Sequence, residues 1–235
     1  MNIGVLVIAT NKYIRFLDPL VESINKYFLT GHSVTVFCFT NIMDHVVPDN
    51  VKLIEQEHMP WPLPTLKRFE IFYKHRDKYE NIDILYYLDA DMLINDYVGD
   101  EFLPGDKELV AVIHPGYRRD YLQSFERRPQ SHACVDWNHH VYHCGGVQGG
   151  KKDSYLKACE ILSNNILDDM KRQIVAIWHD ESHWNKYLIS NPDIYKELDC
   201  DYCYPESPIE DPNRWNLPYK KIIIALHKNP DELRT

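Results

Sequence analysis

The sequence predicts an α/β fold built on a mostly parallel sheet. Short, continuous apolar runs recur along the chain, and such runs are typical of strands that are covered on both faces. In the first part of the chain, segments between these runs have apolar residues at helical spacing. This alternation of strands and helices favours a parallel sheet with helices packed against it. With 235 residues, 44% of them hydrophobic, and no repeat or linker, the chain can bury one large core, so we expect a single domain.

The first half of the chain supplies four strands and two helices. The expected strands are 5–9, 34–39, 51–54 and 82–88. We expect the first helix at 18–28, where Leu20 and Ile24 share one face. The second helix is expected at 65–79, after the proline-rich stretch 60–64, which is too stiff to be helical.

The second half is less regular. The expected elements are a strand at 109–113, helices at 155–170 and 181–188, and a last strand at 222–226. The segment 114–143 is polar and aromatic without clear periodicity, as functional or mobile loops often are. The glycines of 145–150 indicate a tight backbone that a ligand can approach, but they match neither the P-loop nor the GxGxxG pattern.

Composition narrows the range of functions. The formal net charge of −9 argues against a nucleic-acid binder and against stable binding to an anionic membrane. The apolar run that opens the chain is too short to span a bilayer and has no signal-peptide features, so we expect a soluble, cytoplasmic protein. Six cysteines in a chain of this length are no disulfide framework, and we expect reduced thiols, including the pair Cys200 and Cys203.

Two carboxylates follow the apolar strand expected at 82–88. Asp89 and Asp91 are separated by one residue, so in an extended chain both side chains lie on the same face. Mg²⁺ and Mn²⁺ at nucleotide sites are commonly bound by one or two carboxylates together with phosphate oxygens. The pair therefore indicates a divalent metal site, although aspartates also end strands simply because they favour turns.

Three ionisable residues stand together before the helix expected at 181–188. Asp180 and Glu181 could serve chemistry, or they could merely stabilise the start of that helix. His179 and His183 have the spacing of a zinc-chelating pair, but the zinc-protease pattern needs Glu directly after the first His, where this chain has Asp180.

Basic residues are few in this acidic chain. A diphosphate could be neutralised by any of Lys67, Arg68, Arg127, Arg128, Lys228 and Arg234, although each taken singly is also typical of a solvated surface charge.

At this point the chain resembles glycosyltransferase family six, the group that contains the ABO blood-group transferases and α1,3-galactosyltransferase. The resemblance spans nearly the whole chain. The segments that carry it are 9–13, 65–69, 88–91, 114–117, 125–131, 145–150 and 177–187. The last of these, which opens with Ile-Trp-His-Asp-Glu-Ser, is the most specific.

The resemblance implies a GT-A fold, a Rossmann-like mixed sheet flanked by helices. In such a fold, residues 1–91 would mainly bind the nucleotide, and 92–235 would mainly bind the acceptor and end in a C-terminal lid. The implied reaction is retaining transfer of N-acetylgalactosamine or galactose from a UDP-sugar to the 3-hydroxyl of a galactoside or fucosylated galactoside, forming an α1,3 linkage. The implied cofactor is Mn²⁺, with Mg²⁺ as the alternative.

Roles for individual residues follow from the resemblance by position. It implies that Glu181 is the catalytic nucleophile or oxocarbenium stabiliser, and that Asp89 and Asp91 hold the metal. The residues implied to bind the donor are Ala9, Tyr13, Arg68, Asp89, Asp91, Gly145, Gly146, Asp180, Lys228 and Arg234. The residues implied to bind the acceptor are His114, Ser124, Cys144 and Trp178.

Some positions distinguish this chain within the resemblance. In the family that this chain resembles, many bacterial members carry Asn-x-Asn at the metal site and work without metal. This chain instead has Asp-x-Asp at 89–91. The specificity position reads Cys-Gly-Gly at 144–146, and small residues there favour N-acetylgalactosamine over galactose. The competing hypothesis is a catalytically inactive glycan- or nucleotide-binding module of the same fold, which would have no reason to keep Asp89, Asp91 and Glu181 together.

Overall fold

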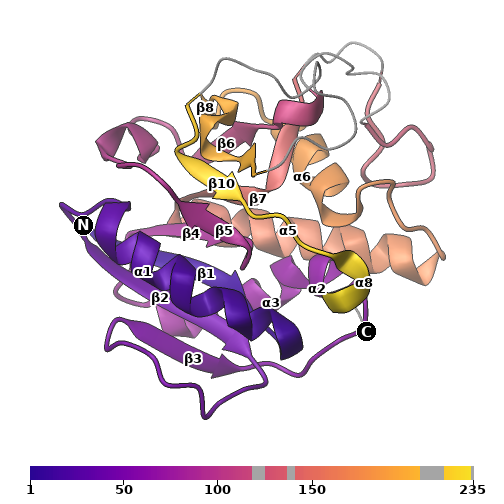
Figure 1. The fold of residues 1–235 in the computed structure, drawn as a ribbon. Helices are drawn as coiled ribbons and strands as arrows, with labels where there is room; N and C mark the ends of the chain where they lie inside the picture. Colours follow the sequence, from indigo (N-terminus) through magenta and orange to yellow (C-terminus); the bar gives the residue numbers. More distant parts are fainter. Residues whose placement is uncertain (118–124, 137–140, 207–219, 234–235) are drawn as a thin grey trace.

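Seven strands form one mixed sheet through the middle of the protein, in the order β3-β2-β1-β4-β7-β6-β8 (Figure 1). The computed structural model describes residues 1–117, 125–136, 141–206 and 220–233. The strands are β1 (Asn2–Ile8), β2 (Ser33–Thr40), β3 (Val51–Glu55), β4 (Ile84–Leu88), β6 (Leu109–Ile113), β7 (His143–Lys151) and β8 (Tyr195–Leu198). Neighbouring strands are parallel except at β7, which runs antiparallel to both β4 and β6.

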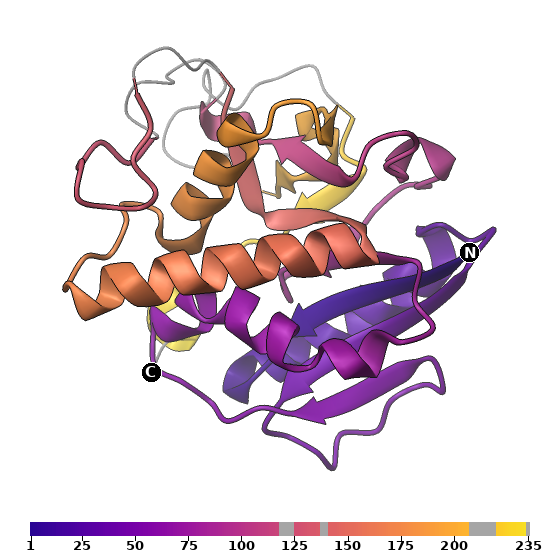
Figure 2. The same cartoon turned by 180° about the vertical axis from the view of Figure 1, so that it is seen from behind.

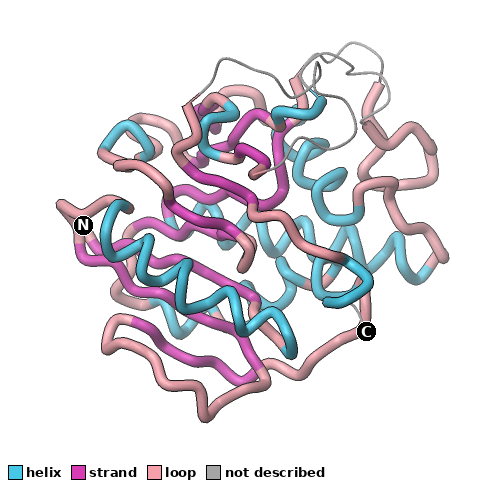
Figure 3. The backbone as a smooth tube through the Cα atoms, in the orientation of Figure 1, coloured by secondary structure: helices cyan, strands magenta, loops and turns pink. Residues whose placement is uncertain are grey.

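Helices cover both faces of this sheet (Figure 3). The α-helices are α1 (Leu17–Tyr27), α2 (Leu63–Leu66), α3 (Arg68–Lys74), α5 (Lys152–Lys171), α6 (His179–Ser190) and α8 (Pro230–Leu233). The short 3₁₀ helices are η1 (Asn11–Phe16), η2 (Arg76–Tyr79), η3 (Asp100–Phe102), η4 (Pro115–Tyr117) and η5 (Cys200–Tyr202). Figure 2 shows α3 and the long α5 lying across the face opposite α1. The predicted α/β fold, a mixed sheet flanked by helices, is confirmed.

The alternating side chains of β1 divide the core into two clusters. Val5 and Val7 pack with Leu20 and Ile24 of α1 on one face. Leu6, between the two valines, packs on the other face with the aromatic and aliphatic side chains of α3, α5 and α6. Because successive strand residues point to opposite faces, one continuous apolar run serves both clusters, as the sequence predicted for a strand covered on both sides.

A small second sheet returns the end of the chain to the middle of the molecule. It contains β5 (Met92–Ile94), β10 (Ile223–Ala225) and β9 (Tyr204–Pro205), in the order β5-β10-β9. The strand expected at 222–226 is therefore present, but it lies in this second sheet. Its continuation is tied to the segment between β4 and β5, because the Leu226 amide donates to the Asp91 carbonyl at 2.8 Å.

Two local expectations differ from the structure. The single helix predicted at 65–79 is broken into α2, α3 and η2, because Lys67 adopts a non-helical conformation while α2 packs on α6 and α3 on α5. The glycine run 145–150 is the middle of strand β7. Its backbone is tight, as predicted, since a Cβ on Gly149 would lie 2.2 Å from the Leu85 carbonyl oxygen.

In the part of the chain that the structure describes, no helix combines the length and the apolarity needed to cross a bilayer. All six cysteines are free thiols.

Candidate functional site

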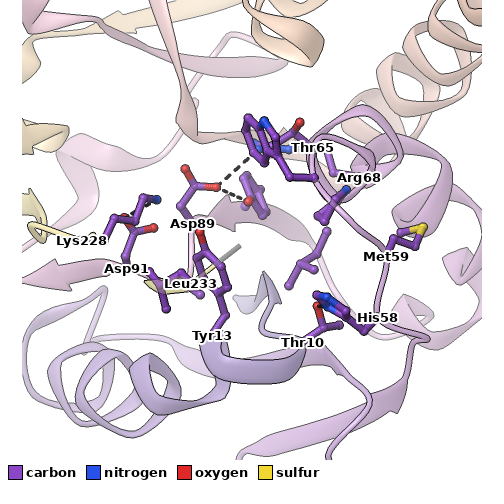
Figure 4. A pocket seen from close by; sticks show the side chains of 15 residues that line it. Thr10, Tyr13, His58, Met59, Thr65, Arg68, Asp89, Asp91, Lys228 and Leu233 are labelled. Carbon is purple, nitrogen blue, oxygen red and sulfur yellow. Dashed lines mark hydrogen bonds and ion pairs between the residues drawn. The ribbon is translucent and has the colours of Figure 1, made fainter. Parts of the chain in front are cut away.

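A cavity of about 160 Å³ opens at the carboxyl ends of β1 and β4 (Figure 4). Thr10 and Tyr13 line it from the segment after β1, and Asp89 and Asp91 line it from the segment after β4. The segment 58–65 and the C-terminal residues Lys228 and Leu233 also line it. This location agrees with the general rule that ligands of open α/β sheets bind beyond the carboxyl ends of the strands.

Asp89 and Asp91 face different cations. One oxygen of Asp89, Oδ1, accepts a hydrogen bond from the Tyr87 hydroxyl and lies 3.4 Å from an Arg68 guanidinium nitrogen. Asp91 Oδ2 is paired at 2.6 Å with the Lys228 ammonium. Burial raises the pKa of Asp89, but Arg68, Lys228 and Tyr87 outweigh it, so the pKa lies below its usual value. At Asp91 burial dominates over the opposing effect of Lys228, and the pKa is raised.

The oxygen ligands that this carboxylate pair offers are of the kind that Mn²⁺ and Mg²⁺ prefer. The described residues contain no cluster of three or more His, Cys, Asp or Glu side chains that could enclose an ion. A hard cation that takes its remaining ligands from phosphate and water needs only one or two carboxylates, and Asp89 and Asp91 line the same cavity. The Lys228 ammonium beside Asp91 would share the negative charge of that carboxylate with a bound ion. The metal role of the pair stays a prediction.

Arg68 connects three elements beneath the cavity. Its guanidinium is almost fully buried and lies over the Tyr87 ring, 4.4 Å from the centroid. Nη1 donates to the Gly145 carbonyl at 2.8 Å, and Nε lies 2.9 Å from Asp180 Oδ2. The planar fork of an arginine suits such a site, where several acceptors converge on one buried cation. Arg68 therefore ties the end of β4 to β7 and to the start of α6.

Asp180 and Glu181 stand at the start of α6, where the sequence placed them. Glu181 Oε2 accepts from the Gly145 amide at 2.6 Å, and the Tyr142 side chain lies nearby. Burial raises the pKa of Glu181 to about 7, against the opposing effects of the Gly145 amide and of Tyr142. Burial likewise raises the pKa of Asp180 to about 7, with Arg68 opposing the shift.

The two histidines of this segment face different neighbours. The His179 ring packs edge-on against Trp61 at 5.2 Å between centroids, and its φ of +54° is in the left-handed region. The buried His183 points to Asp169, with 3.6 Å between Nε2 and Oδ2, and burial lowers its pKa to about 4. Because these neighbours lie on different elements, the zinc-chelating interpretation of the pair gains no support.

The remaining donor-binding predictions differ in their position relative to the cavity. Ala9 is fully buried, and its amide donates to the Phe39 carbonyl at 2.9 Å. Tyr13 lines the cavity, with the Lys228 ammonium 5.7 Å from its ring centroid. Gly146 lies against Asp89, since a Cβ there would stand 2.8 Å from Asp89 Oδ2. Arg234 lies outside the described residues.

The acceptor-binding predictions occupy varied environments. His114 is half-buried, accepts from the Gly116 amide at 3.1 Å and packs against Tyr142. Trp178 is 38% exposed. Cys144 is buried, and its thiol contacts the Val147 carbonyl and Cys203, within the core. Ser124 lies outside the described residues. Contact of these side chains with an acceptor stays a prediction.

Sequence reasoning missed two tyrosines that contact the key carboxylates. Tyr87 precedes Asp89 by two residues in an extended segment, so its placement on the same face could have been deduced from strand geometry. Tyr142 lies in the aperiodic segment 114–143, where no pattern indicated that it would reach Glu181.

Comparison with known proteins agrees with this geometry. The sequence matches the family described as glycosyltransferase family 6 over residues 1–234. It is 32% identical to histo-blood group ABO system transferase 2 of Rattus norvegicus, over 99% of this chain and 71% of that protein. It is 33% identical to globoside alpha-1,3-N-acetylgalactosaminyltransferase 1 of Homo sapiens, over 81% of this chain and 58% of that protein. It is 30% identical to an O-antigen biosynthesis glycosyltransferase of Escherichia coli, over 88% and 89% of the two chains. The chain therefore belongs to glycosyltransferase family 6.

Proposed function

We propose that this protein is a retaining glycosyltransferase that moves N-acetylgalactosamine or galactose from a UDP-sugar to the 3-hydroxyl of a galactoside or fucosylated galactoside. The new linkage would be α1,3. The observation that carries the proposal is the buried Arg68, which joins the carboxylate Asp89 of the cavity to Asp180, the neighbour of Glu181. Arg68 thereby connects the proposed diphosphate site to the segment that carries the candidate reacting carboxylate.

The cavity suits a nucleoside diphosphate. Tyr13 and Trp61 offer aromatic faces for the nucleoside, and Thr10 and His58, 3.0 Å apart, offer polar groups. Lys228 lies at the other side, beside Asp91, where it can neutralise phosphate oxygens. Mn²⁺, or Mg²⁺ in its place, would be held by Asp89 and Asp91 and would neutralise charge on the leaving diphosphate.

Glu181 is suited to stabilise positive charge at the anomeric carbon. When the bond from that carbon to the diphosphate oxygen breaks, its electron pair leaves with UDP and the sugar becomes oxocarbenium-like. An ionised Glu181 can stabilise this cation or bond to it covalently, as carboxylates do in retaining glycosidases. The Gly145 amide holds the carboxylate at 2.6 Å, and this fixes its orientation before substrate binds.

Asp180, held by Arg68, would bind the donor sugar in the same site. A hydroxyl group of the donor sugar that reached Asp180 would find a carboxylate held in place by the guanidinium, 2.9 Å away. Both groups are buried, so their charges act through a medium of low polarity and are weakly screened.

The glycines at 145–146 support preference for the larger donor. Neither position adds a side chain to the site, which leaves room for an N-acetyl group. Gly146 also cannot be enlarged without moving Asp89, since a Cβ would lie 2.6 Å from Met92 Cε and 2.8 Å from Asp89 Oδ2. The human relative named as an N-acetylgalactosaminyltransferase is consistent with UDP-N-acetylgalactosamine as donor here.

Product analysis tests the proposal. Purified protein is incubated with lactose or 2′-fucosyllactose and with UDP-N-acetylgalactosamine or UDP-galactose, and the product is examined by NMR. The expected product carries an α-linked sugar on the galactose 3-hydroxyl, formed faster from UDP-N-acetylgalactosamine. A β-linked product would contradict retention, and binding of donor and acceptor without any product would favour the inactive binding module.

A further inference from the structure

Glu126 is a buried carboxylate that lies outside the cavity and takes no part in the chemistry proposed above. Its Oε1 accepts from the amide and Nε of Arg128, at 2.8 and 2.9 Å. Its Oε2 accepts from Arg128 Nη2 at 2.7 Å and from the Ile177 amide at 2.8 Å. Burial raises its pKa, but these hydrogen bonds outweigh burial and lower the pKa to about 2, so Glu126 stays ionised at neutral pH.

Arg128 extends the same attachment. Its Nη2 also donates to the Val175 carbonyl at 2.5 Å. Glu126 and Arg128 thus hold an amide and a carbonyl of the segment 174–178, two residues apart, and we call these two side chains the clamp. A hydrogen bond to an ionised side chain is stronger than one between neutral groups, so the clamp fixes this backbone firmly.

The clamped segment leads directly into the residues of the site. His179 follows it with a φ of +54°, which is strained for a residue other than glycine. Such strain persists only where the surroundings hold it. The clamp holds the backbone that precedes the turn. Beyond the turn, Ser182 Oγ accepts from the Trp178 amide at 3.0 Å. Glu181 lies between these two attachments.

A second contact joins the clamp to Glu181. Phe125, next to Glu126, packs edge-on against Tyr142 with 5.2 Å between ring centroids. Both rings are buried in one small cluster with Val135. Tyr142 in turn lies close enough to the Glu181 carboxylate to lower its pKa. Movement of the clamp would therefore reach Glu181 through the His179 turn and through the aromatic pair.

We propose that Glu126 is a positioning residue for Glu181. It holds the strained turn at His179 and thereby sets the hydrogen bond between Glu181 and the Gly145 amide. The inference rests on the proposed function in so far as Glu181 is the reacting carboxylate. The mechanical coupling between Glu126 and Gly145 can be measured without any reaction.

The test compares Glu126→Gln with Asp168→Asn. Glutamine keeps the shape of Glu126 but loses the negative charge and replaces one acceptor oxygen by a donor, so it cannot accept from all four N–H groups of Arg128 and Ile177. Asp168 is an exposed carboxylate that bonds His132 in the neighbouring segment, 2.8 Å away, and it makes no described contact with 174–178. The measurements are hydrogen exchange of the Gly145 amide, kcat, and the Kd for UDP.

For Glu126→Gln we expect Gly145 exchange to speed up and kcat to fall, each by about tenfold or more, while the Kd for UDP stays within about twofold. For Asp168→Asn we expect all three quantities to stay within about twofold of wild type. A merely structural role would lower thermal stability but leave kcat per folded molecule unchanged.

The inference is overturned if Glu126→Gln leaves Gly145 exchange and kcat near the wild-type values. Should that variant not fold, Arg128→Lys replaces it, because this half-exposed side chain keeps its charge and loses only its fork. Unchanged Gly145 exchange in Arg128→Lys would then overturn the inference. Absence of glycosyl transfer by the wild type would refute the proposed function, and the Gly145 exchange would still decide whether Glu126 positions Glu181.

Discussion

Replacing Arg68 by methionine tests whether this buried cation holds the site together. The guanidinium lies 2.9 Å from Asp180 Oδ2 and 3.4 Å from Asp89 Oδ1. Methionine fills much of the volume of the arginine stem but leaves Asp180 buried without a cation. Breaking a buried ion pair by removing one partner costs about 3–5 kcal/mol. We expect the free energy of unfolding of Arg68→Met to fall by that amount at about pH 8.

The size of this loss should depend on pH in a definite direction. Burial raises the pKa of Asp180 to about 7 in the folded protein, against a model-peptide value of 3.8. Stability that depends on Asp180 is therefore present at low pH and is lost as the pH rises through about 7. Without Arg68 the pKa rises further, so the loss continues above neutral pH. The difference in unfolding free energy between variant and wild type should then be larger at about pH 8 than at about pH 5.5. At the lower pH, the main remaining contribution to the difference is the lost ion pair of Arg68 with Asp89.

Urea unfolding followed by tryptophan fluorescence measures this difference at both pH values. Arg76→Met is the matched control, because the Arg76 guanidinium stacks on Tyr73 at the surface, 4.7 Å from the ring centroid. We expect the control to change stability by less than about 0.5 kcal/mol. A loss below about 1 kcal/mol for Arg68→Met, or an equal loss at both pH values, would refute the electrostatic account of Arg68.

Three further substitutions probe the cavity and the reacting carboxylate. Glu181→Gln should lower turnover by orders of magnitude and leave the calorimetric Kd for UDP nearly unchanged. Because burial raises the Glu181 pKa to about 7 and the reaction requires the ionised form, kcat of the wild type should rise with pH through about 7. A similar loss of UDP affinity would contradict that role. Lys228→Met removes the cation 2.6 Å from Asp91, and we expect UDP binding to weaken by about tenfold in calorimetry, whereas an unchanged Kd would exclude Lys228 from the phosphate site. Gly146→Ala places a Cβ 2.8 Å from Asp89 Oδ2, so Mn²⁺ binding followed by electron paramagnetic resonance should weaken, while undiminished binding would argue against Asp89 as a ligand.

The sequence predicted the fold where local pattern decides structure. The apolar runs at 5–9 and 82–88 became β1 and β4, because continuous hydrophobic stretches can only be buried as central strands here. The position of Asp89 and Asp91 at the cavity followed from the same pattern, since ligands of open α/β sheets bind beyond the carboxyl ends of such strands.

Other features depend on tertiary contacts that no local pattern reports. The glycines of 145–150 have low strand propensity, yet they lie in β7. At Gly149 and Gly150 a Cβ would stand 2.2 Å from the backbone oxygens of Leu85 and Glu108, so only glycine fits at these two positions. The helix predicted at 65–79 breaks at Lys67 because α2 and α3, on either side of that residue, pack on different helices. The contact between Tyr142 and Glu181 joins segments about forty residues apart, so neither position announces it in the sequence.

Release of UDP from UDP-N-acetylgalactosamine, measured with Mn²⁺ or with EDTA and with or without 2′-fucosyllactose, tests the central claim most directly. We predict release that requires the metal and rises when acceptor is added, because Asp89 and Asp91 line the cavity and Glu181 lies against Gly145, the neighbour of the glycine that abuts Asp89. Release that persists in EDTA would contradict the metal role of Asp89 and Asp91, and absence of release under every condition would contradict the assignment of a transferase reaction to this site.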